Sequence, residues 1–370
     1  MGDGGRRFFL AMDSGNGSGM IRMTRFTWPF LMAMFLAVLP ACTAFSPAPV
    51  VLRDPAVDLV WPPPPAPPKI RFLREITGPD QVVEKQGKVG QFWEMITGEK
   101  KISVPFSAPY GLVWNGAMLY VADPGAGVVH CYDLARHEVD YLLHAGSDEQ
   151  LISPVAVALD GAGNLLVSDS VNARVYVFSP GGKFKYELGH GKIAFKRPAG
   201  IAVNSAGEIF VVDVLAHNLK VFSADGAYLG EFPKQGSGEP LSFPSNVAVD
   251  RTGTVYVTDS MNFAVKVYDR DGTYRRSIGE IGDAPGSFAR PRGIAVDSEL
   301  HVYVVDATFD NFQIFDQEGR LLLFVGSKGK KAGEFSLPSG IYVDQNDRIF
   351  LTDTFNRRIQ VFEYLKKGAN

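Results

Sequence analysis

Short apolar runs separated by polar turns occupy most of the chain, and between residues 106 and 365 one arrangement of these runs occurs six times. In each copy an apolar residue stands three positions before a proline. A β-type run that ends in Asp follows, and a second β-type run comes after a turn. Successive Asp residues are 44 to 47 positions apart. A period of this length is typical of solenoids and propellers.

The same residue types mark every copy. The prolines are Pro109, Pro154, Pro198, Pro244, Pro291 and Pro338. The aspartates are Asp123, Asp169, Asp213, Asp259, Asp306 and Asp353. A residue that is needed once for chemistry would not recur in all copies, so we interpret these positions as structural. A carboxylate after a strand can accept backbone N–H groups and hold the turn.

Each copy contains four short strands joined by polar turns. In the fourth copy the β-type runs are residues 245–250, 254–259, 264–268 and 273–278, rich in β-branched and aromatic residues. Turns that contain glycine join the first run to the second and the third to the fourth, which favours antiparallel hairpins. Four antiparallel strands form one propeller blade, so the sequence predicts an all-β, six-bladed β-propeller.

The ends of the array predict how the ring closes. The sixth copy stops after its third strand, near residue 365, so its fourth strand is missing. Upstream of the first copy, residues 69–76 resemble the fourth strands at 183–188 and 320–325. We therefore expect an N-terminal strand to complete the last blade, which removes the open edge of a linear array.

One family carries this pattern. Residues 333–341, followed by 349–362, resemble the NHL repeat, and the resemblance extends over residues 69–365. The resemblance implies a six-bladed propeller. It implies less about function, because NHL-like propellers include scaffolds, RNA binders, sensor ectodomains and a few metal-dependent lyases.

Residues 1–42 have the pattern of an export signal. Arg22 and Arg25 precede the short apolar stretch 26–38, and residues 39–42 resemble the lipobox of bacterial lipoproteins. That resemblance implies acylation of Cys42, with an ordinary secretory signal cleaved nearby as the alternative. Residues 1–19 do not look like part of a signal, which indicates a start-site artefact. We expect an exported protein, lipid-anchored at the outer membrane and facing the periplasm.

The remaining segments follow in order. Residues 43–68 are a Pro-rich linker, expected to be extended as a spacer; a ligand for a Pro-binding domain is the alternative. Residues 78–104 do not match the repeat and are expected to be an insertion within the propeller, and residues 366–370 form a tail. If Cys42 carries lipid, Cys131 has no disulfide partner, and we expect it to be buried.

Topology places the variable loops at one end of the ring. In an antiparallel meander, the loops before the six prolines and the turns after the six aspartates emerge together, as does the insertion. We call this end the loop face. Residues there that differ between copies are candidates for contact with a partner. The predicted partner-binding residues are Arg174, Arg197, His217, Phe263, Arg292, Asp310 and Arg357.

These features favour a non-enzymatic binding or scaffold propeller, monomeric, that recognises a protein, peptide or glycan through the loop face. We predict no catalytic, cofactor-binding or metal-binding residue. The six histidines occupy unrelated positions, which disfavours a shared zinc site. The alternative is a Ca- or Zn-dependent lyase or lactonase with its site in the central channel. The net charge of -3 gives no electrostatic reason for nucleic-acid binding.

Overall fold

The computed structural model describes residues 52–54, 56–81, 103–147 and 149–366. All of them belong to one compact unit that spans residues 47–370. The predicted signal segment with Cys42, residues 43–51, most of the predicted insertion and the last four residues lie outside the described residues. The helices among the described residues are the short turns η1 (Pro79–Gln81) and η2 (Gly191–Ile193), and none of them is a candidate membrane span.

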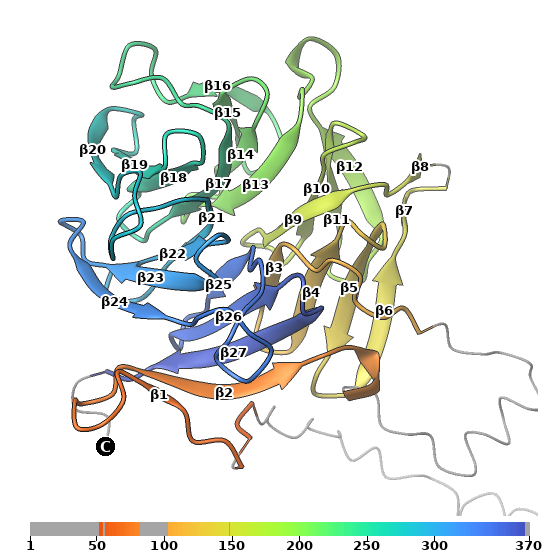
Figure 1. Ribbon diagram of the computed structural model, residues 1–370. Coiled ribbons are helices and arrows are strands. Elements are labelled where there is room, and N and C mark those ends of the chain that lie inside the picture. The colour runs from red at the N-terminus through yellow and green to blue at the C-terminus, as the bar shows by residue number, and fades with distance from the viewer. Residues whose placement is uncertain (1–51, 55, 82–102, 148, 367–370) are drawn as a thin grey trace, which may run out of the picture. The chain divides into compact units, whose positions relative to one another are not determined.

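The described strands form six blades around a central axis (Figure 1). Blades 1 to 3 contain β3 (Leu112–Trp114), β4 (Met118–Asp123), β5 (Val128–Asp133), β6 (Glu138–Leu142), β9 (Pro154–Leu159), β10 (Leu165–Asp169), β11 (Arg174–Phe178), β12 (Phe184–Leu188), β13 (Pro198–Val203), β14 (Ile209–Asp213), β15 (Asn218–Phe222) and β16 (Tyr228–Phe232). Blades 4 and 5 contain β17 (Pro244–Val249), β18 (Val255–Asp259), β19 (Ala264–Tyr268), β20 (Tyr274–Ile278), β21 (Pro291–Val296), β22 (Val302–Asp306), β23 (Asn311–Phe315) and β24 (Leu321–Val325). A small hairpin, β7 (His144–Ala145) and β8 (Glu149–Gln150), joins blades 1 and 2.

Blade 6 draws strands from both ends of the described chain. Its strands are β25 (Ile341–Val343), β26 (Arg348–Asp353), β27 (Arg358–Tyr364), β2 (Ile70–Ile76) and β1 (Val60–Trp61). The innermost strands β3, β9, β13, β17, β21 and β25 each contact the next, and β25 returns to β3. The predicted six-bladed ring is thus confirmed.

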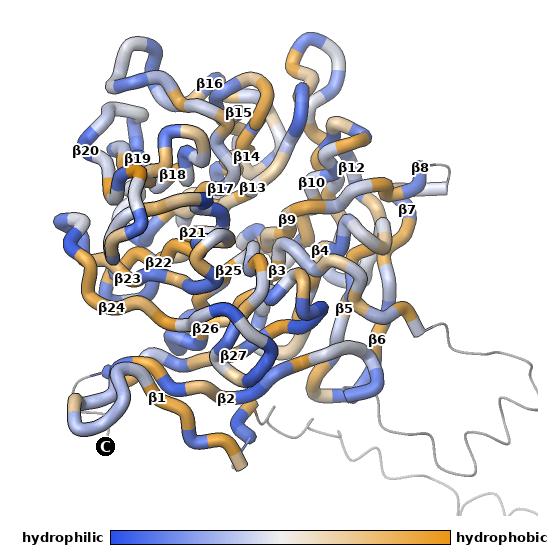
Figure 2. Tube along the Cα trace, viewed as in Figure 1, coloured by the Kyte–Doolittle hydropathy of each residue, from blue (hydrophilic) through white to orange (hydrophobic). Residues whose placement is uncertain are grey.

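The core lies between the blades. The second strands β10, β14, β18 and β22 are buried along their whole length, because both faces of each inner strand meet a neighbouring blade. One interblade cluster joins Tyr303 and Phe312 of blade 5 to Ile349 and Phe362 of blade 6. Hydrophobic stretches accordingly follow the strands, and many turns are hydrophilic (Figure 2).

The N-terminal strand closes the ring as the sequence predicts. Strand β2 pairs antiparallel with β27, from Ile70 opposite Tyr364 to Ile76 opposite Ile359. Its apolar residues Ile70, Phe72, Leu73 and Ile76 are at most 4% exposed. They enter the clusters on both sides of blade 6. Strand β2 therefore contributes buried apolar side chains to the core as well as backbone hydrogen bonds to β27.

The described part of the Pro-rich linker corrects one expectation. Residues 57–61 do not form a free spacer, because Val57, Leu59 and Trp61 pack on the cluster between blades 5 and 6. The Trp61 ring meets the Phe362 ring edge-on at 5.8 Å, and β1 adds a fifth strand outside β2. The prolines at 62–68 predicted an extended spacer over the whole of residues 43–68, whereas the apolar residues at 57–61 are part of the blade.

Candidate binding face

The six repeated aspartates hold the loop face together. All six are buried, and each carboxylate accepts a hydrogen bond from the backbone just before the proline of its own blade. For Asp123 the donors are the N–H groups of Ser107 at 2.7 Å and Ala108 at 2.8 Å. Asp123 also accepts the N–H of Ala126 in the turn. This agrees with the structural role predicted from the repeat and extends it to the pre-proline loop.

Equivalent aspartates sit in different electrostatic environments. Burial raises the pKa of Asp259 above its ordinary value, because the N–H of Ser242 offsets burial only in part. At Asp123 burial acts in the same direction, but His130 and two backbone N–H groups outweigh it and lower the pKa. A carboxyl whose pKa is lowered in the folded state stabilises the protein above its unfolded pKa, and this contribution is lost as pH falls. Asp123 is thus held as an anion by its surroundings.

A second sixfold position escaped the sequence analysis. The residue seven positions after each Asp lies on the third strand and is buried and polar in every blade. These residues are His130, Tyr176, Lys220, Lys266, Gln313 and Gln360. Lys220 Nζ lies 2.9 Å from Asp213 Oδ2, and Gln360 Nε2 lies 3.2 Å from Asp353 Oδ2. Aligning the third strands by the Asp register would have found this position.

The loop face is hollowed at the mouth of the central channel. Blades 1 to 5 line a cavity of about 700 Å³ there, entered between the starts of the innermost strands. Its charged lining residues are Arg197, Arg290 and Arg292, and no carboxylate lines it among the described residues. Arg292 Nη1 donates to Ser339 Oγ at 2.5 Å, and its guanidinium lies 5.6 Å from the Tyr110 ring centroid. Burial lowers the pKa of Arg292, although a guanidinium stays charged at neutral pH.

Exposed apolar side chains are a further feature of the loop face, and two of them, Phe243 and Met261, line the cavity. Thirteen large hydrophobic residues are exposed in the described part of the chain, and seven of them lie within two residues before a repeated proline or two residues after a repeated aspartate. The seven are Ile152, Val171, Leu215, Phe243, Met261, Leu337 and Phe355. Exposed apolar side chains that gather on one face mark interaction surfaces, whereas singly scattered ones are ordinary. None of the seven is among the residues predicted from the sequence, which stand four or five positions after an aspartate or next to a proline.

Three of the predicted partner-binding residues, Arg197, Phe263 and Arg292, line the cavity. His217 is exposed beside it, where its Nδ1 accepts the N–H of Phe243 at 3.1 Å and the two rings lie 4.7 Å apart. Arg357 is exposed in the corresponding turn of blade 6. The structure thus brings part of the predicted set to one face.

Two of the predicted residues do not belong to this set. The fourth residue after each Asp has a left-handed backbone, and in blade 2 that residue is Ala173, not Arg174. Arg174 is the first residue of β11 and pairs with Glu187 at 3.2 Å, so its selection was a register error. Asp310 is buried, and its Oδ1 accepts the N–H of Leu337 at 2.7 Å. It ties blade 5 to blade 6 and is not available to a partner.

The central channel offers little chemistry. The innermost strands line a cavity of about 290 Å³ with mainly small and aliphatic residues. A polar residue in this lining is Asn246, and its Oδ1 accepts the N–H of Val247 at 2.9 Å. Across the described residues no three His, Cys, Asp or Glu side chains gather as a metal site would require. Cys131 is buried as expected, and burial raises its thiol pKa to about 12.

Comparisons with known proteins fit this architecture. One family model, described as a 6-bladed beta-propeller, matches residues 240–312. The observed fold and this match together define a six-bladed β-propeller. A model of the NHL repeat matches residues 195–222 and 335–362. NHL repeats therefore occur within this six-bladed propeller, and the resemblance to the NHL repeat stated from its sequence is confirmed. A comparison with curated protein sequences gives no match.

Solved structures share the fold at low sequence identity. A virginiamycin B lyase from Staphylococcus aureus is 12% identical, with 80% of this chain and 100% of that chain covered and a TM-score of 0.53. A gluconolactonase from Xanthomonas campestris is 18% identical, with 70% and 87% covered and a TM-score of 0.56. An auxiliary nutrient binding protein from Bacteroides ovatus is 14% identical, with 70% of each chain covered and a TM-score of 0.56. These likenesses show the fold alone.

Proposed function

We propose that the chain is a non-enzymatic binding propeller that recognises a protein or peptide segment through its loop face. One observation carries the proposal: three arginines and the exposed apolar side chains of Phe243 and Met261 line a single cavity of about 700 Å³, on a loop face that carries five further exposed apolar residues. Apolar and Arg side chains are characteristic of the centres of protein interfaces. The described channel lining, in contrast, supplies no set of groups for acid–base, nucleophilic or metal chemistry.

The charges of the cavity indicate the chemistry of the partner. None of Arg197, Arg290 and Arg292 forms an ion pair with a described carboxylate. A guanidinium binds a carboxylate through two parallel hydrogen bonds, and it does so more strongly where water is partly excluded. A segment that presents Asp, Glu or a terminal carboxylate between apolar side chains would therefore fit. A neutral glycan would leave the three guanidinium groups without a counter-charge.

Replacing Arg197, Arg290 and Arg292 together with Gln tests this surface. We expect binding of acidic apolar peptides to weaken by at least roughly tenfold, because the anion loses its partners. The measurement is binding to an array in which each acidic peptide is paired with its Asn or Gln counterpart. Wild-type protein should prefer the acidic member of each pair.

The matched control replaces Arg136, Arg270 and Arg320 with Gln. Each of these arginines is exposed in a hairpin between the third and fourth strands, and each forms a surface ion pair. Both triple variants change the net charge equally. Equal loss of binding in the two variants, or equal binding of acidic and amide peptides, would show that the cavity is not the recognition site. Thermal unfolding must show that both variants are folded.

The proposal includes a lipid tether at Cys42, which lies outside the described residues. We expect Cys42→Ala to abolish incorporation of labelled fatty acid and to move the protein from the membrane pellet to the soluble fraction. Metabolic labelling followed by fractionation of the envelope measures both effects. A Cys131→Ala variant is the control, because that thiol is buried in blade 1 and should not be acylated. Unlabelled wild-type protein would instead support the ordinary secretory signal.

A further inference from the structure

A basic loop lies at the edge of the loop face in blade 6. It comprises residues 326–334, between β24 and β25, and carries Lys328, Lys330 and Lys331, all exposed. None of the three ammonium groups lies within 4.0 Å of a carboxylate among the described residues, although the whole chain has a net charge of -3. Arg357 is exposed in the adjacent turn, which contacts the loop through the Asn356 amide and the Gly329 carbonyl at 2.8 Å. The result is a local positive surface on an acidic protein.

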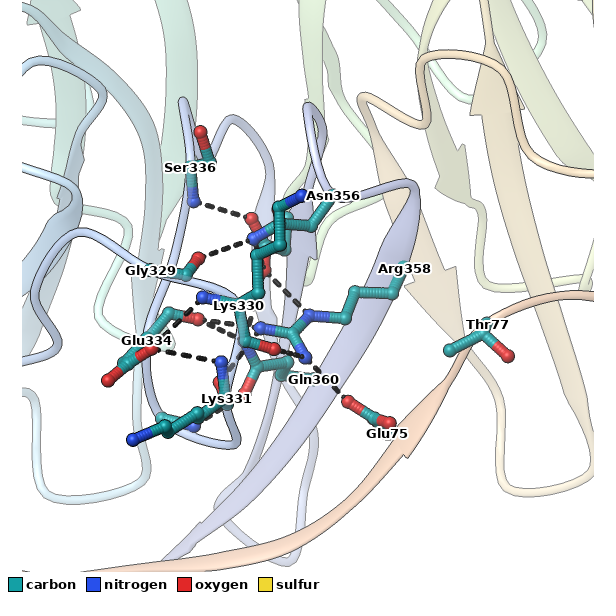
Figure 3. A network of polar contacts seen from close by, with 12 residues as sticks. Glu75, Thr77, Gly329, Lys330, Lys331, Glu334, Ser336, Asn356, Arg358 and Gln360 are labelled. Atoms are coloured by element: carbon teal, nitrogen blue, oxygen red, sulfur yellow. Dashed lines mark hydrogen bonds and ion pairs between the residues drawn. The ribbon is translucent and has the colours of Figure 1, made fainter.

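The backbone of the basic loop is held without help from its lysine side chains. Arg358 donates to the carbonyl oxygens of Lys330, Lys331 and Glu334 at 2.7 to 2.9 Å (Figure 3). The Glu334 carboxylate accepts the N–H groups of Lys330 and Lys331, both at 3.0 Å. These N–H bonds, with that of Lys331 the largest cause, lower the pKa of Glu334. The loop is therefore rigid, and its ammonium groups are free to bind an anion.

The described N-terminal segment borders this loop. The Trp61 ring lies against Gly333, where an added Cβ would meet it at 2.5 Å. Upstream of β1 the chain runs antiparallel to β2, since the N–H of Asp54 donates to the Leu73 carbonyl at 2.6 Å. It thus enters the propeller from the Ile76 end of β2, beside Ile359 and the Arg358 network. The first described residues and the basic loop lie at the same end of blade 6.

We infer that the basic loop contacts an anionic membrane surface. The inference rests on the proposed tether, because the ten residues from 43 to 52 can span at most about 35 Å from Cys42. The blade 6 end of the propeller would then stay within reach of the bilayer. Exposed Lys and Arg side chains close to an anionic surface each contribute favourable attraction that decays within a Debye length. Contact through the three lysines would orient the cavity toward the membrane side, where a membrane-bound partner presents its segment.

Vesicle co-sedimentation of residues 47–370, which make up the compact unit, tests the inference without the lipid. We expect binding to vesicles that contain phosphatidylglycerol and none to pure phosphatidylcholine. Replacing Lys328, Lys330 and Lys331 with Gln should lower the partition coefficient by about 100-fold at low salt, and added salt should weaken wild-type binding likewise.

The control replaces Lys183, Lys192 and Lys196 with Gln, three exposed lysines of blades 2 and 3. Equal loss in both variants, or binding to RNA of mixed sequence but not to vesicles, overturns the inference. Peptide binding at the arginine cavity should persist in the Lys328, Lys330 and Lys331 variant. The membrane inference and the peptide-binding proposal can therefore be contradicted separately. A chain with Cys42→Ala that binds anionic vesicles would uphold the basic surface independently of the acyl anchor, which metabolic labelling tests separately.

Discussion

Truncating the chain before Gly78 is expected to abolish the monomeric propeller. The truncation removes β2 and with it the buried side chains of Ile70, Phe72, Leu73 and Ile76. Burial of each such side chain contributes about 1.5–3 kcal/mol. Their sum approaches the whole stability of a typical domain, about 5–15 kcal/mol. The edge of β27 would also be open to pairing with another chain. Size-exclusion chromatography with light scattering and circular dichroism should show oligomers or an unfolded chain.

A shorter truncation, before Lys69, is the matched control. It removes β1 and the packing of Trp61 but leaves all four regular strands of blade 6. We expect this variant to remain a folded monomer with reduced resistance to urea. If the chain that begins at Gly78 is also a stable monomer with a native circular dichroism spectrum, β2 is not what closes the ring.

The fold could be predicted because its determinants recur. The proline at the start of a first strand and the aspartate at the end of a second strand pair across the hairpin, as Pro244 does with Asp259. Six copies of that pair reveal the period and the strand order of a blade without any long-range information. Ring closure could also be predicted, because the sixth copy lacks its fourth strand and residues 69–76, upstream of the first copy, resemble one. Because all six copies carry the same signal, an ambiguous residue in one copy does not change the predicted fold.

The contacts that define the site were harder to predict. Arg174 was selected one residue out of register, because the turn of blade 2 was aligned by residue character and not by backbone geometry. Ala173 is the true equivalent, and its positive φ shows the shared turn. Asp310 was expected at the surface, but it is buried, and its carboxylate accepts the N–H of Leu337 from the next blade. Contacts between blades depend on tertiary packing, which no single repeat encodes.

The exposed apolar residues of the loop face show a different limit of prediction from sequence. Met261 and Phe355 stand two residues after their aspartates, where a strand-like reading of the turn would place them inside. The structure leaves them 56% and 68% exposed. Burial of the preceding Asp fixes the turn so that the residue two positions on points away from the blade. A sequence alone records hydrophobicity, and it does not record which hydrophobic residues have no neighbour to cover them.

Replacing Arg358 with Gln is expected to destabilise the ring by about 3–5 kcal/mol, because it leaves buried acceptors without a partner. The Arg358 side chain is 6% exposed. It donates to Asp353 Oδ2 at 2.8 Å and to Glu75 Oε2 of the closing strand at 2.7 Å, in addition to three carbonyls of the basic loop. One side chain thus joins β27, β2 and the pre-proline loop of blade 6. Urea unfolding measures the change in midpoint.

Arg174→Gln is the matched control for Arg358→Gln, since both residues stand five positions after their repeated aspartates. The Arg174 side chain is 32% exposed and pairs with the partly exposed Glu187, an arrangement worth about 0–1 kcal/mol. Combining Arg358→Gln with Glu75→Gln should cost less than the sum of the single changes, because the two side chains share one interaction across the closure. If the two arginine variants lose equal stability, or if the combined change is additive, Arg358 does not hold the ring closed.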